Sequence, residues 1–143
     1  MNAPEQPDPL NLIEAQFPRA RPLLVAVAGP PASGKTTLAH ALAQQVQRRA
    51  LALPMHGFHQ SNQWLDARDL RARKGAPETF DARDFVEAVQ NLALGGQAAW
   101  PGFDRSLDAV VPDALAIPHD VEVLLVEGNY LLLDQPVWRD LAP

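Results

Sequence analysis

The segment GPPASGKTT, residues 29–37, combines the residue types and the spacing that bind the phosphates of a nucleotide. It matches G-x-x-x-x-G-K-[ST], a pattern in which glycines let backbone N–H groups turn inward around a phosphate. Lys35 is expected to reach the β- and γ-phosphates, and the Thr36 hydroxyl is expected to ligate Mg²⁺. We therefore predict a site for ATP and Mg²⁺ formed by Gly29, Pro30, Pro31, Ala32, Ser33, Gly34, Lys35, Thr36 and Thr37.

Two other classes of phosphate-loop protein fit the sequence less well. A switch GTPase needs a D-x-x-G after a strand and an N-K-x-D that reads the base, and we find neither. An ATP-binding-cassette ATPase is suggested by LGGQ, residues 94–97, and by LLLDQP, residues 131–136. The first should open a helix but here follows one, and a better buried strand lies upstream of the second. We interpret both as coincidence.

Three apolar runs and the helices between them predict an open parallel sheet. The runs are LLVAVAG (23–29), LALPM (51–55) and VEVLLVEG (121–128). Their lengths and apolar composition are typical of parallel strands buried on both faces. A helix is expected over 35–50, and Asp81 is expected to cap a second helix over 82–94. This order predicts an α/β protein with the P-loop NTPase fold, a three-layer α/β/α arrangement that is present in part.

Three segments with polar residues come directly after the predicted strands. They are residues 29–36, 56–59 and 127–130. Ligands of open α/β sheets bind at the carboxyl ends of the strands. We therefore expect these segments to lie together and to form one site.

The remaining segments are predicted to be mostly irregular. Residues 2–9 are polar and proline-rich and predict disorder within a lead-in of residues 1–21, ahead of a domain of residues 22–143. A short amphipathic helix is expected over 10–17. Residues 61–80 and 100–114 are predicted to be irregular, and LAI, residues 115–117, a small edge strand. His40 and His119 are expected on the surface.

Composition excludes several classes of function. The 143 residues, 47% hydrophobic, suit one domain with a core. A net charge of −5 without a basic stripe disfavours nucleic-acid binding. The absence of cysteine excludes disulfides and Cys-based zinc sites. No apolar run reaches the roughly 18 residues of a membrane span, and the N-terminus does not have the pattern of a signal peptide, so we expect a cytoplasmic protein.

Four further motifs follow the phosphate loop in order. They are PMHGFH..N.WLD from Pro54, RKGAPETFD (73–81), WPGFDR (100–105) and VLLVEGNYLLLD (123–134). Together with the phosphate loop they resemble the phosphoribulokinase, uridine kinase and pantothenate kinase family. The sequence is most similar to the bacterial branch of that family, which contains uncharacterised nucleoside- or sugar-kinase-like proteins. The resemblance covers roughly residues 22–143.

The resemblance implies transfer of the γ-phosphoryl of ATP to a hydroxyl of a nucleoside, a sugar or a pantothenate-like alcohol. Lys35, His56 and Glu127 would be catalytic, and Thr36 and Glu127 would lie at Mg²⁺. The acceptor would be bound by Phe58, His59, Asn62, Arg73, Lys74, Asp104, Arg105 and Asn129. For Arg73 and Lys74 a solvated charge run remains an alternative, and for Asp104 and Arg105 an ordinary polar loop. Trp64, Phe80 and Tyr130 are expected to pack rather than to stack on a ligand.

His56 departs from the family pattern, which usually has an aspartate at this position to orient the acceptor hydroxyl and take its proton. His56 could itself be the base, because an imidazole titrates near neutral pH. The site could instead be weakened, so that nucleotide binds with slow turnover. As a third alternative, Glu127 or Asp104 could replace the missing carboxylate. A metal site at His56 and His59 is disfavoured, because no third histidine or cysteine lies nearby in the sequence.

The length of the chain is a second departure. It stops shortly after the third predicted strand, whereas family members continue into further strands, an arginine-bearing lid and an adenine pocket, which we expect to be absent. A non-catalytic nucleotide-binding or regulatory protein and a plain NTPase therefore remain alternatives to a kinase. The expected partner is a small molecule, with no nucleic acid and no membrane, and a homodimer is left open.

Overall fold

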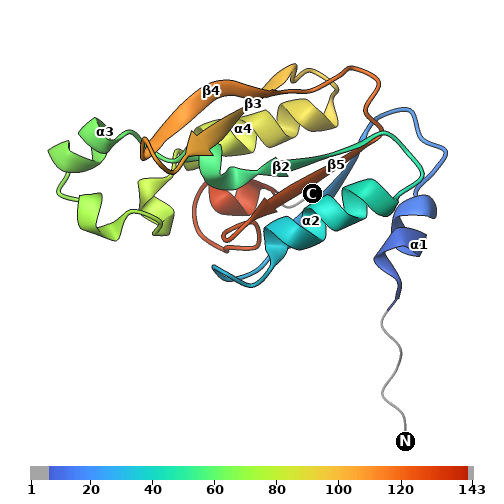
Figure 1. Ribbon diagram of the computed structural model, residues 1–143, viewed down its shortest axis with the longest axis horizontal. Helices are drawn as coiled ribbons and strands as arrows, with labels where there is room; N and C mark the ends of the chain where they lie inside the picture. The colour runs from blue at the N-terminus through green and yellow to red at the C-terminus, as the bar shows by residue number, and fades with distance from the viewer. Residues whose placement is uncertain (1–6, 142–143) are drawn as a thin grey trace, which may run out of the picture.

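A three-stranded parallel sheet forms the centre of the computed structural model, which describes residues 7–141 (Figure 1). The strands are β1 (Leu23–Ala28), β2 (Ala50–Pro54) and β5 (Val123–Gly128), and their order in the sheet is β1-β5-β2. The predicted α/β fold with a parallel sheet is confirmed. Residues 2–6 of the predicted disordered lead-in lie outside the described residues.

The position of each strand in the sheet explains its burial. β5 pairs with a neighbour on both sides, and all of its residues are buried. β1 pairs only with β5 among the described strands, and its Ala26 and Ala28 are exposed. The prediction that this run is buried on both faces is therefore wrong, because an apolar run of this length does not distinguish an edge strand from a central one.

Helices cover both faces of the sheet. Leu124 and Val126 of β5 belong to the core that includes α4, whereas Val123 and Leu125 belong to the core formed with α1 and α2. This alternation gives the predicted three layers. None of the helices in the described residues is long and apolar enough to cross a membrane. The helices are α1 (Pro9–Glu14), α2 (Lys35–Gln45), α3 (Asn62–Ala67) and α4 (Ala82–Ala93).

A β-hairpin occupies the segment that was expected to be a loop. β3 (Ala99–Asp104) and β4 (Ala109–Ala116) pair in antiparallel fashion, so the prediction for residues 100–114 is wrong. Pro101 and Pro112 disfavour a strand in the sequence, but a two-stranded ribbon has two edges at which missing N–H groups are tolerated. The register shifts between Trp100 and Gly102, next to the first proline. The predicted edge strand at 115–117 is the end of β4.

Residues 61–80 also contain more regular structure than predicted. Ser61 caps α3 by accepting a hydrogen bond from the Trp64 N–H at 3.1 Å. A six-residue helix is too short to show a clear helical period, which is why the sequence analysis missed it. The predicted cap of α4 is confirmed, because the Asp81 carboxylate accepts from the Asp84 N–H at 3.1 Å. Single 3₁₀ turns lie at Met55–Phe58, Arg71–Arg73, Pro77–Thr79 and Trp138–Leu141.

Candidate active site

The loop between β1 and α2 contains two glycines, one at each end of its turn. Gly34 precedes the first residue of α2 and has a φ of +89°, a conformation that side chains rarely permit. A Cβ on Gly29 would lie 2.8 Å from the Ser33 Oγ, so that side chain would have to move. The predicted phosphate-binding segment therefore has the tight turn and the helix start that this kind of site requires.

This loop lines a cavity of about 350 Å³ together with three residues from other parts of the chain. They are His56, Arg105 and Asn129, which follow β2, β3 and β5 respectively. Lys35 is only 8% exposed, and its Nζ donates a hydrogen bond to the Pro30 carbonyl at 2.9 Å. The structure thus brings together the ends of three segments that the sequence analysis placed at one site, and adds the end of the hairpin.

Glu127 is a buried carboxylate with one unsatisfied oxygen. It is 2% exposed, and its Oε1 accepts a hydrogen bond from the Thr36 hydroxyl at 2.9 Å. Its Oε2 has no hydrogen-bond partner among the described residues. Because a buried anionic oxygen without a donor is costly, this position fits a cation. Thr36 and Glu127 supply the hard oxygen ligands that Mg²⁺ prefers, next to the phosphate cavity.

The hairpin is fixed against the end of β2, next to His56. Trp100 of β3 is fully buried, and its indole N–H donates to the Pro54 carbonyl at 2.7 Å. Gly57 permits an even closer approach, because a Cβ there would overlap the carbonyl of Pro101. These contacts position the turn that carries His56, whose ring lines the phosphate cavity.

His59 lies in an aromatic stack and not among the residues that line the phosphate cavity. Its ring centroid is 4.1 Å from that of Phe80 and 4.9 Å from that of Phe103, and its Nδ1 lies 2.6 Å from the His56 carbonyl oxygen. Burial lowers the pKa of His59 below its ordinary value. Within residues 7–141, no group of three or more His, Cys, Asp or Glu side chains is placed to hold a metal ion.

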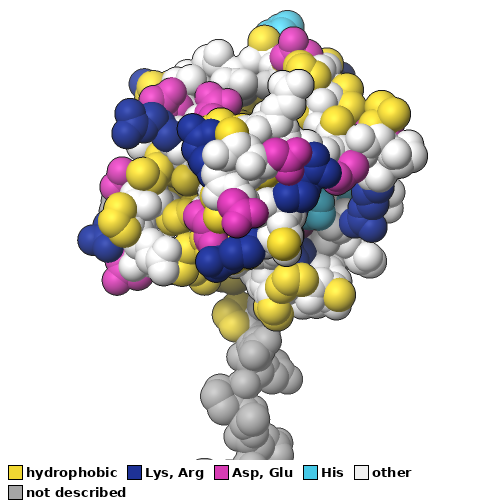
Figure 2. Space-filling model, turned by 90° about the vertical axis from the view of Figure 1, so that its left-hand side faces the viewer, with side chains coloured by type: hydrophobic (Ala, Val, Ile, Leu, Met, Phe, Trp, Pro, Cys, Tyr) yellow, Lys and Arg dark blue, Asp and Glu magenta, His cyan; other side chains and the backbone are white. Residues whose placement is uncertain are grey.

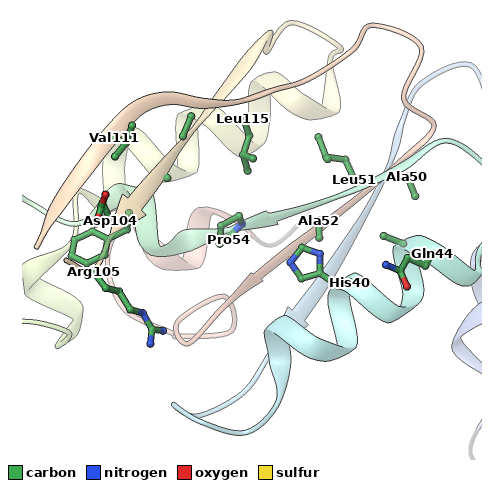
Figure 3. A pocket seen from close by; sticks show the side chains of 14 residues that line it. His40, Gln44, Ala50, Leu51, Ala52, Pro54, Asp104, Arg105, Val111 and Leu115 are labelled. Atoms are coloured by element: carbon green, nitrogen blue, oxygen red, sulfur yellow. The ribbon is translucent and has the colours of Figure 1, made fainter. Parts of the chain in front are cut away.

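A larger cleft of about 800 Å³ lies beside the phosphate cavity, with α2 on one side, β2 at its base and the hairpin on the other side (Figure 3). Most of its lining is apolar, and Arg105 lines both this cleft and the phosphate cavity. Asp104 also lines the cleft, but its carboxylate accepts hydrogen bonds from Ser106 and from the Leu107 N–H, which lower its pKa. His40 is exposed as expected, yet it lines this cleft, a role that no motif in the sequence indicated.

Asn62 and Lys74 come together away from the phosphate cavity. The Lys74 Nζ donates to the Asn62 Oδ1 at 2.8 Å and to the Asp108 Oδ1 at 2.7 Å, and it holds the pKa of the Asp108 carboxyl below its ordinary value. Arg73 pairs instead with Glu78 at 2.6 Å, and its side chain is 65% exposed. Figure 2 views this face, on the side of α3, and basic and acidic side chains are interspersed across it. The environment of Arg73 thus fits the solvated-charge alternative.

The aromatic residues named in the sequence analysis have three different surroundings. Phe58 is 4% exposed and packs against the rings of Phe85 and Trp100, so it belongs to the core. Phe80 and Tyr130 pack together, as predicted, with ring centroids 5.7 Å apart. Trp64 lies on α3, where the Arg68 guanidinium stacks over its ring.

Comparisons with known proteins agree with this geometry. Residues 25–84, which include the phosphate loop, match the model of the family described as "ATPase family associated with various cellular activities (AAA)". The chain is 42% identical to "Uncharacterized protein YggC" of Escherichia coli over 127 residues, which is 85% of this chain and 52% of the relative. It is 36% identical to "Putative uridine kinase C227.14" of Schizosaccharomyces pombe over 129 residues, which is 82% of this chain and 55% of the relative.

The chain therefore spans about half the length of these curated relatives. A solved structure described as a "putative fructose transport system kinase" from Silicibacter sp. TM1040 superposes with a TM-score of 0.85 at 39% identity. That match covers 92% of this chain and 68% of the other. The AAA match covers less than half of the chain, whereas the matches to proteins described as kinases extend over 82% and 92% of it. The chain belongs to the P-loop kinase family that includes uridine kinase and pantothenate kinase.

Proposed function

We propose that the protein transfers the γ-phosphoryl of ATP to a hydroxyl of a small metabolite that binds in the cleft between α2 and the hairpin. One observation carries this proposal. The phosphate cavity lies beside a cleft of about 800 Å³, and Arg105 lines both spaces. A plain NTPase needs room only for water, whereas this cleft has the size of a small-molecule site.

Four residues in or beside the phosphate cavity have defined tasks in this reaction. Lys35 exchanges its hydrogen bond to the Pro30 carbonyl for one to the phosphates. Thr36 and Glu127 would hold Mg²⁺, which would neutralise charge on the phosphate oxygens. His56 accepts the proton of the acceptor hydroxyl. The oxygen of that hydroxyl forms a bond to the γ-phosphorus. At the same time the bond from the γ-phosphorus to the β–γ bridging oxygen breaks, and ADP is released.

The second candidate is a nucleotide-binding protein with slow turnover. Two features of His56 favour this candidate. The residue occupies the position of the family's aspartate, and no hydrogen-bonded partner within residues 7–141 orients its ring. A general base is most effective when a second group fixes its orientation. This candidate predicts ATP affinity that depends on Lys35, without labelled product.

The test is transfer of labelled γ-phosphate from Mg-ATP to a panel of nucleosides, sugars and vitamin alcohols, with the unaltered chain and with His56→Asp. We expect the unaltered chain to label one metabolite. Labelling only by His56→Asp would instead support the binding protein. ATP hydrolysis that no metabolite accelerates would indicate an NTPase and contradict the proposal.

A further inference from the structure

Arg105 stands where the two spaces of the site meet. It follows the last residue of β3, and its side chain extends from the end of the hairpin, as Figure 3 shows. The same side chain lines the phosphate cavity, opposite the loop that contains Lys35. It is thus the one arginine among the described residues that borders that cavity.

The guanidinium of Arg105 is not engaged by the protein. It has no hydrogen bond and no ion pair within residues 7–141, and the neighbouring Asp104 carboxylate is directed to Ser106 and Leu107. Other arginines are neutralised by carboxylates: Arg48 by Glu14 and Glu122, Arg49 by Asp120, Arg71 by Asp66, Arg73 by Glu78 and Arg139 by Asp134. The donors of Arg105 are therefore available to a ligand.

The charges of the cavity favour a second basic side chain besides Lys35. Lys35 is the one basic residue of the phosphate loop, and Glu127 adds a negative charge beneath it. A nucleoside triphosphate brings several further negative charges, and its last phosphate carries more of them than either of the other two. A guanidinium presents two parallel donors to phosphate oxygens, a geometry that an ammonium lacks.

We propose that Arg105 binds the terminal phosphate of the nucleotide from the side of the acceptor cleft. The hairpin would then contribute a phosphate-binding residue in addition to a wall of the cleft. This inference rests on the proposed function only in that ATP is the ligand of the phosphate cavity. It assigns Arg105 to the nucleotide, whereas the family resemblance assigns it to the acceptor.

The test compares three proteins: the unaltered chain, Arg105→Ala and Arg105→Lys. For each, calorimetry with Mg²⁺ and no acceptor measures the Kd for ADP and the Kd for an ATP analogue with a non-hydrolysable β,γ-imido bridge. We expect Arg105→Ala to weaken binding of the analogue roughly 10- to 100-fold, as for a lost charge-assisted hydrogen bond, with ADP affinity unchanged. Arg105→Lys should recover part of that loss. Arg83→Ala is the matched control, because Arg83 is exposed on α4 and has no ion pair in the described structure.

Equal losses for both nucleotides, or no loss for the analogue, would overturn the inference. The inference would also be overturned if Arg105→Ala raised the acceptor KM while the ratio of its affinities for the ATP analogue and for ADP stayed at the value of the unaltered chain. Arg105 would then be a residue that binds the acceptor. The affinity ratio is measured without phosphoryl transfer. If the unaltered chain binds both nucleotides but labels no metabolite, the proposed function fails while the ratio still decides the role of Arg105.

Discussion

The phosphate side and the acceptor side of the site carry their charges in different ways. Lys35 and Glu127 are 8% and 2% exposed, and each is held by a protein atom before any ligand binds. Lys74 and Arg73, which the family resemblance assigns to the acceptor, instead pair with exposed carboxylates at the surface. Buried charges are costly and strongly coupled to a ligand, whereas exposed pairs contribute at most about 1 kcal/mol. The charged side chains of the phosphate side are therefore preorganised for a ligand, whereas those assigned to the acceptor can change partners at little cost in free energy.

The largest expected effect on activity is that of Lys35→Ala, on the phosphate side. We expect kcat/KM for transfer to fall roughly 10²–10³-fold, because the cavity loses its buried cation. Lys74→Ala is the matched control, since Lys74 donates to Asn62 and Asp108 and not to the phosphate loop. Steady-state kinetics on both variants checks the comparison. A loss of similar size in Lys74→Ala would show that the two sides are not distinct.

Glu127→Gln should produce the next largest effect. We expect the affinity for ATP in the presence of Mg²⁺ to fall roughly 10- to 100-fold, the usual consequence of losing a group that orients a metal ion. The melting temperature of the ligand-free chain should stay the same or rise, because a buried charge with an unsatisfied oxygen is removed. Calorimetry and thermal unfolding measure the two quantities.

Asp134→Asn is a suitable control for that variant, because its carboxyl is 92% exposed. A fall in melting temperature without loss of Mg²⁺-dependent affinity would mean that Glu127 has a structural role only.

Gly57→Ala should displace the hairpin and leave the phosphate loop unchanged. The added Cβ would overlap the Pro101 carbonyl and push the hairpin away from the turn of His56. We expect the free energy of unfolding to fall by about 1–3 kcal/mol and the acceptor KM to rise, with ADP affinity unchanged. Gly96→Ala is the control, because its nearest atom, the Asn91 carbonyl oxygen, would lie 3.7 Å away. Loss of ADP affinity in Gly57→Ala would contradict the separation of the two sides.

The smallest expected effect concerns His59. Burial lowers its pKa, so the folded state favours the neutral ring and the unfolded state binds the proton more readily. Its contribution to stability is present above the ordinary histidine pKa of about 6.5 and is lost as the pH falls through the lower, folded value. Nearby Lys74 also disfavours the proton, and Asp108 favours it. Denaturant unfolding at several pH values should show a shallower acid loss in His59→Gln, and an identical slope would refute this.

Sequence reasoning was most successful where a short segment determines its own shape. The helix that begins after Gly34, the cap at Asp81 and the burial of β5 follow from local residue patterns and were confirmed. The position of Glu127 beneath Thr36 followed from the rule that parallel strands end at one edge of the sheet.

The hairpin was missed because its strands are stabilised by each other and by distant contacts. The bond from Trp100 to Pro54 and the close approach at Gly57 leave no local signal. The pairing of Asn62, Lys74 and Asp108 likewise depends on how the chain folds back, and the lining of the cleft by His40 depends on where the hairpin lies. For the residues expected to bind the acceptor, the sequence therefore predicted the region of the molecule in which they lie, but not the contacts that they make.

The order of the strands has a consequence for how the chain acquires its shape. β1 and β2 precede β5 in the sequence and do not pair with each other; β5 lies between them, and Leu23 pairs with Val123. The sheet therefore cannot close on the ribosome until β5 has emerged, and such long-range pairing slows folding. Until then β1 and β2 lack the strand that joins them, and unpaired apolar strands are prone to aggregate.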